Sequence, residues 1–209
     1  MAGRNRAGNA ASKRATIMFG AALAAALLAG CAKGTTTPTA APTATPTGAP
    51  TLTPEGYGPL RVGMSAEAAA RAFDPAGGGA PLGRAGDGAC VEGAPAGAPP
   101  GLRAMAEQGR LTRVTVAEGA TVRTERGVGV GDPAEAVDAA YGARVVTRPA
   151  KYEPRPAETK TVWTTGAPVG RDWTDDETAR GLRFEIGTDG RVQAIHGGGV
   201  SIQYAEGCS

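Results

Sequence analysis

The chain has 209 residues, with 22 lysines and arginines against 20 aspartates and glutamates, and one histidine. Four of the basic residues precede residue 31, so the remainder of the chain carries a formal charge of −2. The chain has no basic run interleaved with aromatic side chains, so the sequence gives no electrostatic support for nucleic acid as a partner.

Residues 1–30 have the pattern of a secretory signal, with a basic start, a short apolar middle and small residues at the end. The apolar run is shorter than the about 20 residues that a membrane-spanning helix needs. The sequence LAGC at 28–31 resembles the lipobox of bacterial lipoproteins. That resemblance implies cleavage before Cys31, a lipid on its sulfur, and anchoring to the extracytoplasmic face of the cell membrane. Ordinary secretion with an unmodified Cys31 is the alternative.

Residues 31–53 comprise the lipidated cysteine and a linker rich in Thr, Pro and Ala. The stretch from 34 to 53 has no charge and almost no large apolar side chain, so it cannot bury a core. We therefore expect a disordered, semi-rigid stalk. The folded domain is expected at 54–209, about the length of one ordinary domain.

An internal repeat marks this domain. The box LRVGMSAEAAARAF at 60–73 aligns without gaps with VGVGDPAEAVDAAY at 128–141. Each box predicts a glycine turn followed by a short helix, with Ser65 as the N-cap in the first copy and Asp132 in the second. Gly142 is a suitable stop for the second helix.

Strands are expected after each helix. Alternating apolar residues predict strands at 111–118, 182–186 and 192–196, with a hairpin turn at 188–190 between the last two. A further strand is expected at 200–204, and a capping box predicts a short helix over 174–181. These elements predict an α+β fold, in which two helix-plus-antiparallel-strand repeats pack as one domain.

Cysteine usage predicts one disulfide. If Cys31 carries lipid, Cys90 and Cys208 remain as a pair in an oxidising compartment, where a disulfide persists. A metal-thiolate site and a redox pair are the rival interpretations. Both are disfavoured, because the chain has no CxxC spacing and His196 is its only histidine.

The sequence predicts no catalytic, cofactor-binding or metal-binding residue, and we do not expect an enzyme. His196 and Ser201 are the nearest approach to a base and a nucleophile, but their spacing along a strand points them to opposite faces. The glycine run at 127–131 fits neither phosphate-loop template and predicts a structural turn. Trp163 and Trp173 either fill the core or mark a contact surface.

The two boxes resemble the helix-plus-sheet repeats of the β-lactamase inhibitor protein BLIP and of the outer-membrane assembly lipoprotein BamE. They are especially similar to a box in actinobacterial lipoproteins. The resemblance implies a non-catalytic module that binds a protein partner at the cell envelope. A carrier of a small molecule or lipid is the first alternative, and an envelope hydrolase is less favoured because a base is missing.

Overall fold

The structure is a computed structural model that describes residues 48–77, 80–83 and 89–208. The chain divides into two units, 1–45 and 46–209, and the described residues belong to the second. The predicted signal, the lipidation site at Cys31 and most of the predicted linker lie outside the described residues. Within the described ranges, no helix is both long and apolar enough to cross a membrane.

The described residues form ten strands, two α-helices and two 3₁₀ helices. In chain order these are β1 (Leu52–Thr53), β2 (Gly56–Tyr57), β3 (Leu60–Arg61), α1 (Ala66–Ala70), β4 (Cys90–Gly93), β5 (Leu102–Glu107), β6 (Arg110–Val116), α2 (Ala134–Tyr141), η1 (Gly142–Arg144), β7 (Val146–Pro149), β8 (Glu158–Thr165), β9 (Arg180–Ile186), β10 (Val192–Gly198) and η2 (Val200–Gln203).

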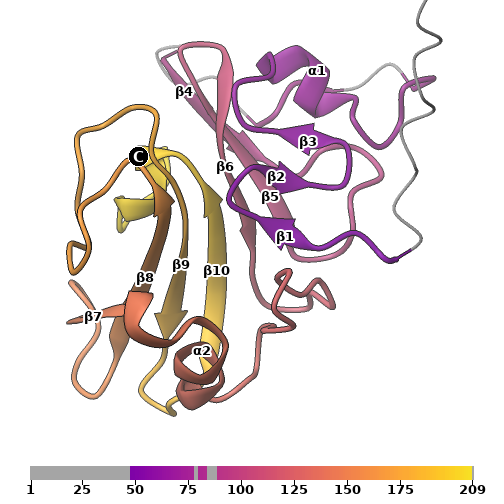
Figure 1. The fold of residues 1–209 in the computed structure, drawn as a ribbon. Helices are drawn as coiled ribbons and strands as arrows, with labels where there is room; N and C mark the ends of the chain where they lie inside the picture. The colour runs from indigo at the N-terminus through magenta and orange to yellow at the C-terminus, as the bar shows by residue number, and fades with distance from the viewer. Residues whose placement is uncertain (1–47, 78–79, 84–88, 209) are drawn as a thin grey trace, which may run out of the picture. The chain divides into compact units, whose positions relative to one another are not determined.

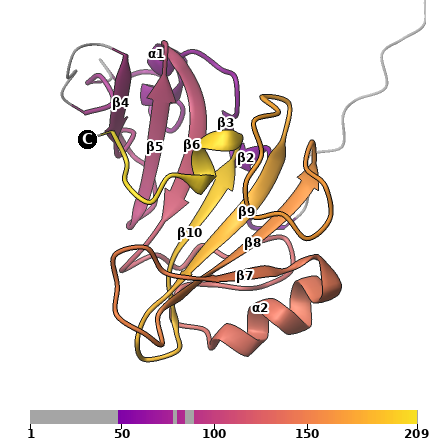
Figure 2. The same ribbon diagram turned by 90° about the vertical axis from the view of Figure 1, so that its left-hand side faces the viewer.

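Two antiparallel sheets organise these elements. The larger sheet has seven strands in the order β4-β5-β6-β10-β9-β8-β7, and the smaller has the order β1-β2-β3. Figure 1 shows the small sheet and α1 on one side of the large sheet, and Figure 2 shows the opposite face of the large sheet turned toward the viewer. Strand β1 begins at Leu52, inside the segment assigned to the linker from the sequence.

The expected α+β fold of two helix-plus-strand repeats is wrong. The described chain is mostly antiparallel sheet, and its two α-helices have only five and eight residues. Strands β1–β5, β7 and β8 were not expected from the sequence, and β5 is an example. Its alanines at 104 and 106 favour helix in isolation, but they alternate with Arg103 and Met105 and face the core of a sheet. Burial on the pleated surface therefore overrides the helical preference of alanine.

The two predicted helix starts have different outcomes. Ser65 is the N-cap of α1 as predicted, and its hydroxyl accepts a hydrogen bond from the Ala68 N–H. Asp132 is not the N-cap of α2; Pro133 occupies that position and makes no side-chain cap. The Asp132 carboxylate instead accepts from the Gly129 N–H at 2.9 Å, which stabilises the turn before the helix. Gly142 ends α2, as expected.

Both boxes rest on a hairpin turn of the large sheet through equivalent backbone hydrogen bonds. In each copy, two N–H groups of the box donate to carbonyls at the turn. The bonds are Gly63 N to Leu111 O and Ala66 N to Gly109 O in the first copy, and Gly131 N to Val192 O and Ala134 N to Gly190 O in the second. The repeat therefore recurs as a local docking pattern on the β5–β6 and β9–β10 hairpins.

Three further predictions concern the C-terminal third. The hairpin with its turn at 188–190 is confirmed, because β9 pairs antiparallel with β10 across it. The predicted strand at 200–204 is wrong, because this segment leaves the sheet and forms η2. The predicted helix over 174–181 is also wrong. The Thr174 hydroxyl donates to the Gly166 carbonyl instead of capping a helix, and β9 already begins at Arg180.

The apolar core lies between the two sheets. Phe184, Ile195 and Val114 come from central strands of the large sheet and are fully buried against the small sheet and α2. Gly197 permits the close approach of β1, because a Cβ there would lie 2.6 Å from the Thr53 carbonyl oxygen. The opposite face of the large sheet is polar, and it carries the features described next.

Candidate functional site: the polar face of the large sheet

A row of polar side chains crosses the centre of this face. Thr115 on β6, His196 on β10 and Arg183 on β9 are cross-strand neighbours in the antiparallel register. All three are buried, although they lie on the side away from the apolar core. We call this surface, together with the segments that cover it, the polar face.

A disulfide holds the end of the chain against the polar face. Cys90 on the edge strand β4 is bonded to Cys208, so the predicted disulfide is confirmed. In Figure 2 the yellow C-terminal segment runs from η2 across β6 toward β4. The bond therefore closes a long loop and fixes residues 200–208 over the strands.

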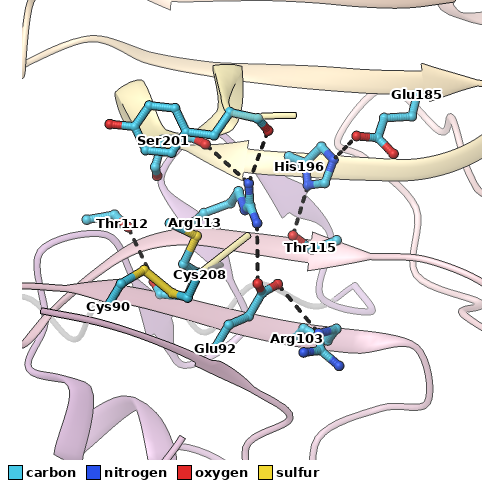
Figure 3. Close-up of polar contacts among 12 residues, drawn as sticks. Cys90, Glu92, Arg103, Thr112, Arg113, Thr115, Glu185, His196, Ser201 and Cys208 are labelled. Atoms are coloured by element: carbon cyan, nitrogen blue, oxygen red, sulfur yellow. Dashed lines mark hydrogen bonds and ion pairs between the residues drawn. A yellow bond between two sulfur atoms is a disulfide. The ribbon is translucent and has the colours of Figure 1, made fainter. Parts of the chain in front are cut away.

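Arg113, on β6 of the large sheet, binds the same C-terminal segment. Its guanidinium donates to the Ser201 carbonyl at 3.2 Å and forms an ion pair with Glu92 at 3.5 Å (Figure 3). The carboxylate of Glu92 also pairs with Arg103 at 3.5 Å. Arg113 is 3 % exposed, and the pairing compensates in part for the cost of burying its charge.

His196 bridges two side chains instead of meeting the serine considered from the sequence. Its Nδ1 lies 2.9 Å from the Thr115 hydroxyl and its Nε2 lies 3.1 Å from the Glu185 carboxylate (Figure 3). Ser201 is not among its partners, and the Ser201 hydroxyl has no hydrogen bond among the described residues. Burial lowers the pKa of His196 despite the adjacent Glu185, with Arg113 and Arg183 acting in the same direction as burial.

Arg183 is the most unusual charge on this face. It is 9 % exposed, its Nη1 donates to the Gln203 carbonyl at 3.2 Å, and its Nε has no acceptor within the described ranges. Burial lowers the pKa of this guanidinium, and the nearby carboxylates of Glu185 and Asp172 oppose that shift. A buried donor without an acceptor is costly, and the Nε of Arg113 shares this property. Arg183 differs from Arg113 in having no ion pair among the described residues.

Of the two tryptophans, one is buried and the other lies on the surface. Trp163 is buried against Ile202 of η2, whereas Trp173 is 53 % exposed on the loop between β8 and β9. The side-chain amide of Gln203 fixes this loop through two hydrogen bonds to the backbone of Thr174, at 2.8 and 3.0 Å. The ring of Trp173 lies 6.5 Å from that of Tyr204. The exposed indole is therefore held in a defined position.

Two adjoining clefts open on the polar face. The first has a volume of about 560 Å³ and includes Trp173 and Arg148; we call it the Trp173 cleft. The second, of about 540 Å³, includes Gln193 and is called the Gln193 cleft. Both clefts are lined by Arg183 and by Tyr152, whose side chain is 60 % exposed.

The chemistry of this arrangement is recognition by aromatic and charged groups. Trp, Tyr and Arg are the residue types enriched at protein-binding hot spots. Among the described residues, no three His, Cys, Asp or Glu side chains are placed to hold a metal ion. The predicted turn at the end of 127–131 is present, because Asp132 N donates to the Gly129 carbonyl, and it lies on neither cleft.

Sequence reasoning identified Trp173 and His196 as candidates but did not find Arg183, Tyr152 or Gln203. Arginine at 183 alternates with the apolar residues of β9, which is the ordinary pattern of a solvent-facing position. In the fold the C-terminal segment covers it, and its Nη1 donates to the Gln203 carbonyl. Thr159, Thr161 and Trp163 alternate along β8 and lie on the polar face. This alternation was the sequence pattern from which the β8 part of the face could have been predicted.

The chain matches no protein-family model, no curated protein and no solved structure.

Proposed function

We propose that this protein is a lipid-anchored, non-catalytic module on the extracytoplasmic face of the cell membrane, and that it binds an envelope protein through its polar face. The observation that carries the binding proposal is the fixed, exposed Trp173 beside Tyr152 and the buried Arg183. Rigid aromatic anchors lose little conformational entropy on binding, which favours affinity.

The disulfide supports a location outside the cytoplasm. A bond such as Cys90–Cys208 forms and persists in oxidising compartments and is rare among cytosolic proteins. The signal-like segment and the lipobox at 28–31 support the same location independently. Two acyl chains on Cys31 would give stable anchoring, because a single chain of myristoyl length holds a protein only marginally.

A carrier of a small molecule is the second candidate, and the cleft volumes favour it. Both clefts fall in the range of about 300–1,000 Å³ typical of ligand pockets. Such pockets are lined mainly by apolar side chains, whereas charged residues such as Arg148, Lys151 and Asp172 line the Trp173 cleft. This lining fits a protein surface better than an apolar ligand.

A hydrolase is not supported by the same geometry. The hydroxyl nearest to His196 belongs to Thr115, which is 6 % exposed on the floor of the polar face. A catalytic nucleophile must reach its substrate, and this position offers little access. The Thr115–His196–Glu185 row fits a satisfied polar network better.

Photocrosslinking in intact cells tests the binding proposal. A photoreactive amino acid is placed at Trp173, and the matched control carries it at Ala139, which is exposed on α2. We expect one reproducible crosslinked protein from position 173 and none of that mass from position 139. Equal crosslinking from both positions, or none from either, would contradict a binding surface at the polar face.

Metabolic labelling tests the anchor. Wild-type protein should incorporate a radiolabelled fatty acid, and Cys31→Ala should abolish the incorporation. The Cys208→Ser variant is the control, because it removes a different cysteine and should keep the label. Undiminished labelling of Cys31→Ala would exclude the proposed attachment site.

A further inference from the structure

Arg183 has the properties of a cation that lacks its anion. It is more than nine-tenths buried, lies between two clefts and has an Nε donor with no acceptor in the described part of the chain. A guanidinium presents its donors in a fixed fork that matches the two oxygens of a carboxylate. An acidic group beside this side chain would give the guanidinium an anionic partner in a site of low dielectric, where a charged interaction is strong.

The charges around the clefts decide which of them would admit such a group. The Gln193 cleft contains four carboxylates and only two cations, so it repels a further acid. Its carboxylates are Glu153, Glu158, Glu185 and Asp189, and its cations are Lys151 and Arg183. The Trp173 cleft contains three cations, Arg148, Lys151 and Arg183, against the carboxylates of Asp172 and Glu206.

Ion pairing within the Trp173 cleft removes one cation and one carboxylate and leaves the excess of one cation. Arg148 Nε lies 3.4 Å from the Asp172 carboxylate, so the charge of Asp172 is compensated locally. The ammonium of Lys151 lies 4.6 Å from the ring centroid of Tyr152, which keeps a cation at the wall shared by the two clefts. An incoming carboxylate would therefore meet Arg183 and Lys151, and Glu206, which acts electrostatically on Lys151, is the carboxylate that opposes it.

The aromatic side chains of the cleft indicate which kind of group lies next to the carboxylate in the ligand. Trp173 is 53 % exposed at the edge of the cleft, and its Nε1 donor is already satisfied by Asp175 at 3.2 Å. The indole therefore offers an apolar surface to an incoming group. A peptide that carries a glutamate or aspartate next to an apolar or aromatic residue meets both requirements, whereas a free acid meets only one.

We propose that the Trp173 cleft binds a segment of the partner protein that carries an acidic side chain next to an apolar residue, with Arg183 receiving the carboxylate. This inference rests on the proposed function, because it assigns the chemistry of the partner at the same surface. It also gives Arg183 an anionic partner, as Glu92 is for Arg113, which Arg183 lacks among the described residues.

NMR titration of the folded, disulfide-bonded protein tests the proposal. The probe is the dipeptide acetyl-Trp-Glu-amide, and acetyl-Trp-Gln-amide is its uncharged match. The readouts are the Nε–H resonances of Arg183 and Arg113, since both of these donors are buried without an acceptor. We expect the Glu dipeptide to shift the Arg183 signal saturably, with Arg113 as the internal control. The Gln dipeptide should bind at least ~10-fold more weakly, because it lacks the charged hydrogen bonds.

Two variants test whether the shift of the Arg183 resonance reports binding in the Trp173 cleft. Arg183→Gln should remove binding, which is then followed by Trp173 fluorescence. Lys151→Gln, at an exposed position that leaves the fold intact, should weaken binding by about threefold. If Arg183→Gln fails to fold, the Arg183 signal of the wild type and the Lys151→Gln variant still decide the outcome.

Three results would overturn the proposal. No shift of Arg183 with the Glu dipeptide would show that the cleft does not take a carboxylate. Equal binding of the Glu and Gln dipeptides would remove the role of the charge. Glutarate binding as tightly as the Glu dipeptide would assign the site to a free acid. Crosslinking at position 173 is independent of these results, so the proposed protein-binding surface can fail or stand separately.

Discussion

Gln203 and Thr174 are joined by two hydrogen bonds, although they are 29 residues apart and lie on different segments. The Gln203 amide donates to the Thr174 carbonyl at 2.8 Å and accepts from its N–H at 3.0 Å. A single side chain thus gives the β8–β9 loop the pairing that a neighbouring strand would otherwise provide. The C-terminal segment is in this way linked directly to the loop that presents Trp173.

Replacing Gln203 by Ala should loosen that loop. Both bonds are buried, and leaving the Thr174 groups unpaired should cost about 1–3 kcal/mol of unfolding free energy. Hydrogen exchange at the Thr174 amide should accelerate strongly. Exchange in β6 should accelerate only as much as the lower free energy of global unfolding requires. Gln193→Ala is the matched control on an exposed position. Unchanged protection of the Thr174 amide would contradict this role of Gln203.

Removal of the disulfide should destabilise the domain strongly. The bond joins residues 118 positions apart, for which the chain-entropy model gives about 5 kcal/mol. We expect the double variant Cys90→Ser, Cys208→Ser to lose about 2–5 kcal/mol in urea unfolding. Reductant should destabilise the wild type by a similar amount and leave the variant unaffected. A variant as stable as the oxidised wild type would contradict this prediction.

Stability should fall on acidification through His196. Its folded pKa is lowered, so the folded state resists protonation while the unfolded state gains a proton below about pH 6.5. The free energy of unfolding should therefore decrease between pH 7 and pH 5. Glu185 adds a second loss below its unfolded pKa, because its folded pKa is also lowered.

The variant His196→Gln isolates the histidine contribution. It removes the group that titrates in this range, so its unfolding free energy should change less between pH 7 and pH 5 than that of the wild type. Thermal or urea unfolding at each pH measures the difference. An equally steep decline in the variant would show that another group is responsible.

Gly197 in β10 and Gly199 just after it provide a matched test of the packing between the sheets. A Cβ on Gly197 would lie 2.6 Å from the Thr53 carbonyl oxygen, whereas the nearest atom to a Cβ on Gly199 is 3.5 Å away. Gly197→Ala should force β1 off the large sheet and cost about 1–3 kcal/mol. Gly199→Ala, at a φ of −83°, should change unfolding free energy by less than about 0.5 kcal/mol. Equal effects would contradict the close approach of β1.

Local chemistry allowed part of this structure to be predicted from the sequence. The Ser65 cap, the hairpin turn at 188–190, the Gly142 stop and the pairing of Cys90 with Cys208 all depend on few neighbours, and all are present. The fold class was wrong because the strands within 52–61, 90–107 and 146–165 were not expected and the two helices are short. Strand formation in those segments depends on pairing and burial against elements distant in the chain.

The polar face as a whole could not be predicted from the sequence. The segment 200–204 alternates like a strand, yet it turns into η2 after three glycines and covers the sheet. Along that path Gln203 contacts Arg183, which is a buried cation in the fold. No local pattern distinguishes this case from an ordinary surface position, because both show the same alternation along β9.

The affinity of Trp173→Ala for the protein recovered by crosslinking tests the central claim most directly. Val169→Ala is the matched control, since its side chain is 91 % exposed on the same loop. If the polar face is the binding surface, Trp173→Ala should weaken binding at least ~10-fold, as expected for an aromatic anchor, and Val169→Ala by less than ~3-fold. Unchanged affinity of Trp173→Ala would contradict the account.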